Sequence, residues 1–117
     1  MINKIRYNKL NKRWLLEREE RKKLSRKMLD VVSIKGKTVF RKFDIKKVLL
    51  FGSVVEERSF NDSDVDILVL PLKKDQYWEC LRELENAIAF PVDLYTQDDD
   101  VKLVDKILSR GKVVYEI

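Results

Sequence analysis

Two aspartates separated by one residue, Asp64 and Asp66, stand at the start of an apolar run that ends at Leu70. Side chains two apart on a β-strand share a face and lie about 6–7 Å apart, so we expect both carboxylates to project together at the mouth of a cleft. Carboxylate oxygens prefer magnesium, calcium or manganese to zinc. Because chance alone produces such pairs in a chain with 11 aspartates, the alternative of a polar strand entrance has to be weighed by context.

Gly52 and Ser53 give part of that context, because they directly follow a second apolar run that ends at Phe51. A strand that ends in Gly-Ser and then enters a short helix offers free backbone N–H groups and a hydroxyl. These groups are suited to binding phosphate. A Gly-Ser pair after a strand is more often a plain turn, so the pair gains meaning only together with the carboxylates.

Asp93 is the third candidate, within the otherwise apolar run from Pro91 to Tyr95. An aspartate in a buried strand is costly unless it is paired or binds a metal. The alternative is an aspartate on an edge strand that faces water.

Three carboxylates that meet at one place could hold two magnesium ions for an in-line phosphoryl displacement. The chain contains no histidine, which excludes histidine-based triads and histidine-ligated zinc sites. Carboxylates or lysines would therefore have to perform any catalysis. Asp93 is the residue whose position suits it to take the proton from an attacking hydroxyl.

The elements that position these residues follow from hydrophobic periodicity and from Gly and Pro breaks. Helices are expected at residues 7–32, 74–88 and 101–109, with Gly36 as a breaker and Asp98, Asp99 and Asp100 as caps for the last helix. Strands are expected at residues 47–51, 65–70, 91–95 and 113–115, and residues 38–43 as an extended connector or short strand. The order predicts one α/β (α+β) domain with a small mixed sheet packed by helices.

The rest of the composition narrows the class of protein. The only cysteine, Cys80, excludes a disulfide framework within the chain and is expected in the core. No window approaches the ~20 apolar residues of a membrane span, and the polar N-terminus does not resemble a signal peptide. We therefore expect a cytoplasmic protein.

Charge is distributed unevenly along the chain. Residues 1–50 hold 17 Lys and Arg against 5 Asp and Glu, a net of +12, and residues 51–117 hold 8 against 15, a net of −7. The basic half could meet nucleic acid or an acidic partner, or could be a solvated helix. Trp14, Leu15 and Leu16 add apolar surface to this helix, which leaves a homo-oligomer open.

The three site elements together resemble the signature of the minimal nucleotidyltransferases, in the DNA polymerase beta-like superfamily. The matching segments are Phe51-Gly52-Ser53, then Ser63-Asp64-Val65-Asp66-Ile67-Leu68-Val69 with Asp64 eleven positions after Ser53, and Val92-Asp93-Leu94 as the third carboxylate strand. The resemblance covers residues from Lys46 to about Ile117, and the preceding helix has a family counterpart. It implies a single nucleotidyltransferase domain over residues 1–117. Residues 1–45 would form the basic helix and connector, and residues 46–117 the core.

The resemblance also implies roles for individual residues. Asp64, Asp66 and Asp93 would be the catalytic carboxylates and the magnesium ligands. Gly52, Ser53 and Ser63 would bind the nucleoside triphosphate. Small members of this family often act as antitoxins that transfer AMP from ATP to a tyrosine of a HEPN-domain RNase toxin, or that bind the toxin.

We therefore expect a magnesium-dependent protein adenylyltransferase with a small helical HEPN-type partner. Two alternatives stay open: a non-catalytic module that neutralises such a toxin by contact, and a nucleic-acid-binding accessory protein. One departure from the family pattern favours the first alternative. Where the family carries a glycine shortly after Gly-Ser, this chain has Glu57, which with Glu56 places negative charge near the expected triphosphate.

Overall fold

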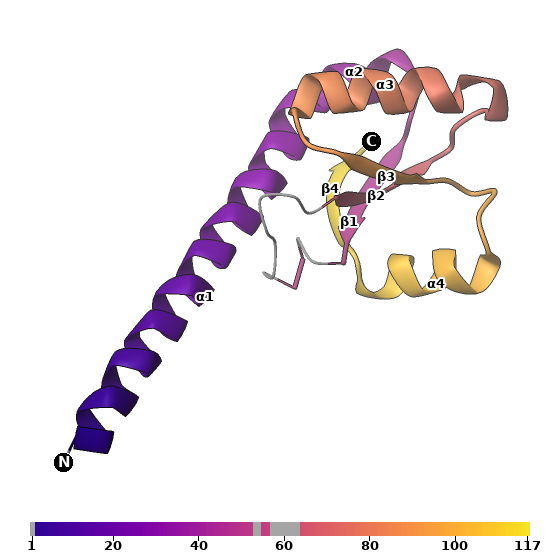
Figure 1. The fold of residues 1–117 in the computed structure, drawn as a ribbon. Helices are drawn as coiled ribbons and strands as arrows, with labels where there is room; N and C mark the ends of the chain where they lie inside the picture. Colours follow the sequence, from indigo (N-terminus) through magenta and orange to yellow (C-terminus); the bar gives the residue numbers. More distant parts are fainter. Residues whose placement is uncertain (1, 53–54, 57–63) are drawn as a thin grey trace.

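The computed structural model describes residues 2–52, 55–56 and 64–117, with the side chains of residues 2–12 left out (Figure 1). Apart from two additional short helical segments, its elements follow the predicted order. They are α1 (Ile2–Lys35), α2 (Lys37–Lys42), β1 (Lys47–Phe51), β2 (Val65–Leu70), the 3-10 turn η1 (Lys74–Gln76), α3 (Tyr77–Ile88), β3 (Val92–Tyr95), α4 (Val101–Arg110) and β4 (Lys112–Glu116).

The strands form one mixed sheet in the order β3-β2-β1-β4. β1 is antiparallel to both β2 and β4, whereas β2 and β3 are parallel. Parallel neighbours need a crossover connection, and α3 provides it. This arrangement confirms the predicted fold class.

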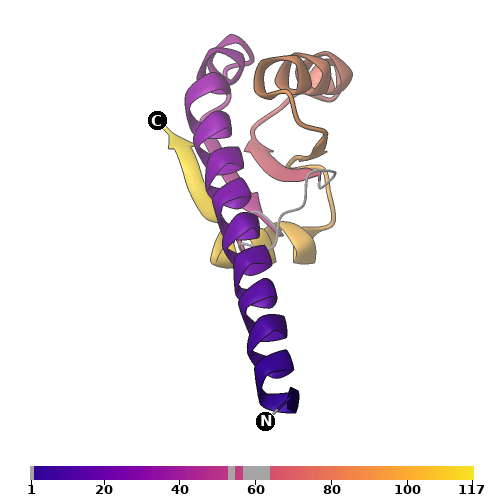
Figure 2. The same cartoon turned by 60° about the vertical axis from the view of Figure 1, so that its left-hand side comes forward.

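Helices cover both faces of the sheet (Figures 1 and 2). The C-terminal part of α1, together with α2 and α3, covers one face, where Ile67 and Leu84 belong to the larger core cluster. On the opposite face α4 packs through Ile107 against Leu49 and Leu68. Alternate residues of β1 and β2 therefore belong to different clusters, as the period of a strand requires.

Residues 38–43 do not form an extended connector or a strand, so that prediction is wrong. Most of them lie in α2, which begins after Gly36. Val39 and Phe40 are buried, and the Phe40 ring lies 5.3 Å from that of Tyr115 on β4. Burial of these side chains outweighs the strand preference of β-branched and aromatic residues.

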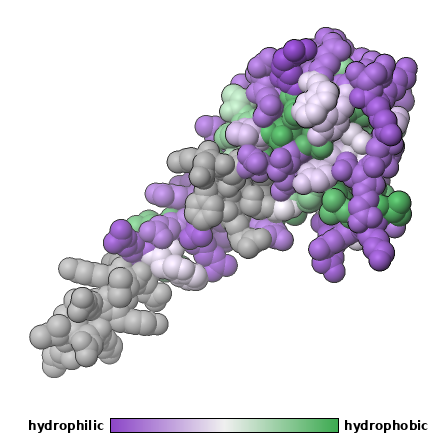
Figure 3. Space-filling model, turned by 45° about the vertical axis from the view of Figure 1, so that its right-hand side comes forward, coloured by the Kyte–Doolittle hydropathy of each residue, from purple (hydrophilic) through white to green (hydrophobic). Residues whose placement is uncertain are grey.

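Helix α1 is longer than predicted and projects from the rest of the molecule (Figure 1). Residues 13–20 are all exposed, including Trp14, Leu15 and Leu16. In Figure 3 hydrophilic groups dominate the coloured surface of this helix, while apolar groups gather on the compact part. Although α1 is long, no helix in the described ranges is apolar enough over its length to cross a bilayer.

Candidate functional site

Asp66 and Asp93 come together because β2 and β3 are parallel neighbours. In their register Asp66 pairs with Asp93, at the end of the sheet where both strands begin. Both residues alternate with members of the larger core, so they face the α4 side. Asp64 directly precedes β2 and is exposed.

The electrostatic state of Asp66 reflects this crowding. The pKa of its carboxyl is raised from 3.8 to about 6, first by burial and then by the charge and hydrogen bond of Asp93, with a smaller effect of Asp64. A partly buried acid beside a second acid resists ionisation because two negative charges share a poorly solvated space. Such a pair favours the binding of a cation.

Gly52 closes the site from the end of β1. Its backbone φ is +74°, a left-handed conformation that favours glycine. A Cβ at this position would collide with the Asp66 carboxylate. The turn after β1 therefore packs directly against Asp66. The predicted nucleotide-binding residues Ser53 and Ser63, and the departure Glu57, lie outside the described residues.

Asp93 lies on the edge strand β3 and its side chain is exposed. The interpretation of Asp93 as a buried aspartate is therefore wrong, and the edge-strand alternative gives its location correctly. The sequence analysis expected Asp93 to meet the other two aspartates, and the register of β2 and β3 places it beside Asp66.

Two aromatic rings extend this face of the sheet. Tyr95 lies two residues after Asp93, and its ring is 5.1 Å from that of Phe51 in an edge-on arrangement. Burial raises the pKa of the Tyr95 hydroxyl, and the charges of Asp66 and Asp93 raise it further. In the sequence Tyr95 is recognisable only as a strand residue, and no local pattern indicates its place beside the carboxylates.

A cavity of about 280 Å³ opens next to Gly52, between the turn after β1 and α4. Two cations of α4, Lys106 and Arg110, line it together with Phe51 and Ile107. Neither cation was predicted from the sequence as a site residue. The only available signal was their spacing of four residues, which places two side chains on one helix face.

The carboxylate pair fits a magnesium ion. Within the described ranges no three His, Cys, Asp or Glu side chains form a group that could hold a metal by themselves. Magnesium is, however, usually bound by one or two carboxylates together with water and substrate phosphates. Asp66 and Asp93 meet that requirement, while the three-carboxylate site that includes Asp64 stays a prediction.

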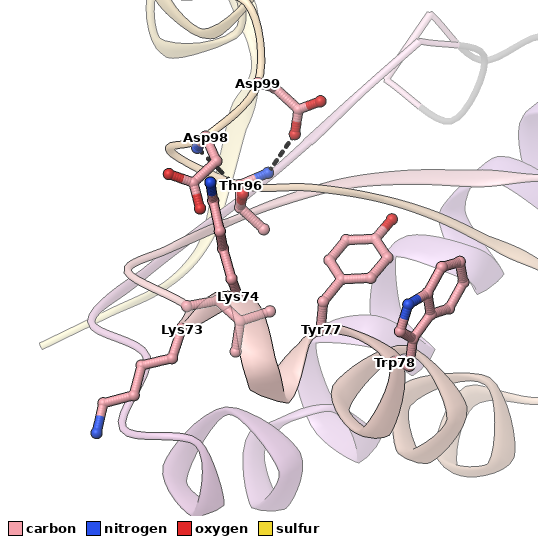
Figure 4. Close-up of a pocket in the computed structure, with 8 residues that line it drawn as sticks. Lys73, Lys74, Tyr77, Trp78, Thr96, Asp98 and Asp99 are labelled. Carbon is pink, nitrogen blue, oxygen red and sulfur yellow. Dashed lines mark hydrogen bonds between the residues drawn. The ribbon is translucent and has the colours of Figure 1, made fainter.

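A second cavity, of about 310 Å³, lies at the opposite end of the sheet (Figure 4). Tyr77 and Trp78 line it from the start of α3, and Asp98 and Asp99 from the loop after β3. It borders the residues that follow β2 and β3. Leu72 lies about 20 Å along the chain from Asp66, and Thr96 about 10 Å from Asp93. Its lining shares no residue with the carboxylate pair or with the cavity next to Gly52.

The three aspartates before α4 were predicted to cap that helix, and this prediction is wrong in its mechanism. Asp100 occupies the N-cap position without a side-chain capping hydrogen bond. Asp99 instead accepts a 2.8 Å hydrogen bond from the backbone N–H of Thr96 and so fixes the turn after β3.

Comparisons with known proteins find nucleotidyltransferase relatives whose fold is similar to the one described above. Residues 34–117 match the family model described as polymerase beta, nucleotidyltransferase. The comparison with curated proteins found no match.

Several solved structures are similar to this chain. A toxin–antitoxin structure with AMP-PNP is 24% identical over 73% of each chain, with a TM-score of 0.64. The toxin–antitoxin pair MntA-HepT is 22% identical over 75% of this chain and 73% of that one, with a TM-score of 0.58. A tri-AMPylated Shewanella oneidensis HEPN toxin in complex with an MNT antitoxin is 21% identical over 76% and 73%, with a TM-score of 0.56. At these identities the likeness concerns the fold.

Proposed function

We propose that this chain, which belongs to the polymerase beta nucleotidyltransferase family, transfers AMP from ATP to a partner protein in a magnesium-dependent reaction. The observation that carries the proposal is the Asp66–Asp93 pair beside the Gly52 turn. The raised pKa of Asp66 is typical of groups at functional sites, where like charges are held close together. The cytoplasmic location expected from the sequence is part of the same proposal.

In this reaction Asp66 and Asp93, with Asp64, would be the residues that hold magnesium. Bound magnesium would neutralise charge on the phosphoryl oxygens. Gly52, together with Ser53 and Ser63, would bind the phosphates, since the absence of a Cβ at Gly52 leaves room for close backbone approach.

The transfer forms a bond between the acceptor hydroxyl oxygen and the α-phosphorus of ATP. The bond from that phosphorus to the bridging oxygen of the β-phosphate breaks, and pyrophosphate leaves. Asp93 is exposed and lies beside Asp66, so it is the carboxylate placed to take the proton of the acceptor hydroxyl.

The proposed acceptor is a tyrosine of a small helical HEPN-type protein, and the chain would act as its antitoxin. Support comes from the similar solved structures, which are toxin–antitoxin complexes and include a tri-AMPylated HEPN toxin. The second candidate is neutralisation of such a toxin by contact alone. The two glutamates Glu56 and Glu57 favour it, since they add negative charge where the family carries a glycine.

A transfer assay with the full chain, a HEPN-type partner, magnesium and ATP labelled at the α-phosphate tests the proposal. We expect label on the partner, and a loss of at least about a hundredfold in Asp66→Asn. Metal-assisted charge stabilisation contributes several kcal/mol, and about 1.4 kcal/mol is a factor of ten. Asp98→Asn makes the same chemical change at the distant cavity and should retain transfer.

The outcomes separate the two candidates. Absence of label on the partner with the unaltered chain contradicts the enzymatic proposal. Tight partner binding by Asp66→Asn without ATP, combined with that absence, establishes the binding module instead.

A further inference from the structure

The cavity next to Gly52 has a composition that the carboxylate site does not explain. Its lining combines the apolar side chains of Phe51 and Ile107 with two cations, Lys106 and Arg110. Lys106 and Arg110 are one helical turn apart, so both can approach a single ligand.

The cavity and the carboxylate pair share a boundary. Phe51 lines the cavity and pairs with Asp66 in the register of β1 and β2. Gly52 also lines the cavity, and a Cβ added to it would reach the Asp66 carboxylate. A molecule with one phosphate near Asp66 could therefore extend past Gly52 to the two cations.

The two cations are available for a ligand. The ion pairs formed within the described part of the chain involve other basic residues, namely Arg13, Lys42, Lys46 and Lys47. Both Lys106 and Arg110 are exposed. A cation in the last turn also interacts favourably with the helix dipole, which is a sufficient reason for Arg110 alone. It does not account for Lys106 lining the same cavity.

We propose that Lys106 and Arg110 bind the terminal phosphates of the nucleoside triphosphate whose α-phosphate lies at Asp66 and Asp93. The inference rests on the proposed nucleotidyltransferase function and adds the residues that bind the leaving pyrophosphate. The planar guanidinium of Arg110 suits two phosphate oxygens at once, and the ammonium of Lys106 adds a compact charge.

Calorimetric titration of the full chain with sodium tripolyphosphate, in low salt without magnesium, tests the anion site directly. We expect the unaltered chain to bind, and the double variant Lys106→Gln/Arg110→Gln to bind about tenfold more weakly or worse, since hydrogen bonds to charged groups are lost. The matched control Lys73→Gln/Lys74→Gln removes the same charge at the distant cavity and should bind as the unaltered chain does.

A second titration, in magnesium, compares ATP with AMP. The unaltered chain should prefer ATP, and the Lys106→Gln/Arg110→Gln variant should lose most of that preference while AMP affinity stays the same. Equal melting temperatures of the two double variants establish that neither change acts through folding.

The results distinguish this inference from the proposed function. No tripolyphosphate binding by the unaltered chain, or equal binding by the Lys106→Gln/Arg110→Gln variant, overturns the inference even if AMP transfer is observed. If tripolyphosphate binding depends on Lys106 and Arg110 but no AMP is transferred, the anion site is supported and the proposed enzymatic function is contradicted.

Discussion

The two ends of the sheet differ in how their polar side chains are paired. Where β2 and β3 begin, Asp66 and Asp93 are brought side by side, and their charges repel each other when both are ionised. Where these strands finish, polar groups are paired. The Gln97 amide accepts a 3.0 Å hydrogen bond from the backbone N–H of Leu72 and donates a 2.7 Å one to its carbonyl, and the Tyr77 hydroxyl donates one to the Leu94 carbonyl.

This difference in pairing distinguishes the end of the sheet that stabilises the fold from the end that is suited to binding a ligand. Hydrogen bonds that close on the chain itself stabilise the fold, and few buried polar groups in native proteins lack such partners. A crowded acid pair costs stability, and is retained where a ligand compensates the charge. Although the distant cavity is slightly larger, the carboxylate end is therefore the better candidate for chemistry.

Gln97→Ala should remove hydrogen bonds at the end where β2 and β3 finish, and should leave the Asp66–Asp93 pair at the other end unchanged. The substitution removes both hydrogen bonds to the Leu72 backbone. We expect the free energy of unfolding to fall by about 2 kcal/mol, because the partly buried N–H and C=O lose their partners. Urea denaturation measures the loss. Gln76→Ala is the matched control, since Gln76 makes no capping hydrogen bond, and it should change stability by under about 0.5 kcal/mol.

AMP transfer by Gln97→Ala, assayed well below its melting temperature, should equal that of the unaltered chain. A selective loss of transfer in this variant would contradict the assignment of chemistry to the carboxylate end.

The free energy of unfolding should depend on pH because of Asp66 at the carboxylate end of the sheet. The pKa of Asp66 is about 6 in the folded chain against 3.8 ordinarily, so the folded state holds more protons between these values. Stability contributed by this group is thus present below pH 4 and is lost as pH rises through 6. For this partly exposed side chain the loss should be about 1–2 kcal/mol, after allowing for screening by solvent.

Thermal unfolding of the unaltered chain and of Asp66→Asn between pH 4 and 7 measures this effect. The variant lacks the titrating group, so its stability should fall less over that range. Parallel pH curves for the two proteins would show that the Asp66–Asp93 contact does not strain the fold.

Trp78→Ala should have the smallest effect of the series. Its side chain is 76% exposed at the rim of the distant cavity. We expect a change in stability of under about 0.5 kcal/mol, and unchanged ATP affinity by thermal shift. Weaker ATP binding by this variant would indicate that the nucleotide binds at the cavity lined by Trp78 and not at the carboxylate end.

Much of the fold could be predicted from local pattern. β1 and β2 are apolar runs that stop at Gly52 and Pro71, and their observed bounds match the prediction. The prediction of an extended segment from Thr38 was wrong because Thr38, Val39 and Phe40 are residue types that favour strands locally. Its helical form depends on burial of Phe40 against β4, which is far away in sequence.

The site could be predicted only in part, for a similar reason. The sequence selected Asp66, Asp93 and Gly52 as candidates, and the structure places them side by side. Their roles stay predictions, and the pairing of the two aspartates depends on how β2 and β3 align across α3. Local pattern carries no such register. Lys106 and Arg110 look like ordinary surface cations on a helix, and only the packing of α4 under the sheet brings them to Gly52.

The projecting helix α1 has a consequence for how the protein diffuses. Its 34 residues span about 51 Å, and the whole molecule measures 64 × 29 × 22 Å. The radius of gyration is 17.4 Å, against about 13 Å for a compact chain of this length. A single copy will therefore tumble anisotropically and elute from a sizing column ahead of a spherical protein of 14.0 kDa. Sedimentation equilibrium, which depends on mass and not on shape, is the appropriate way to count copies.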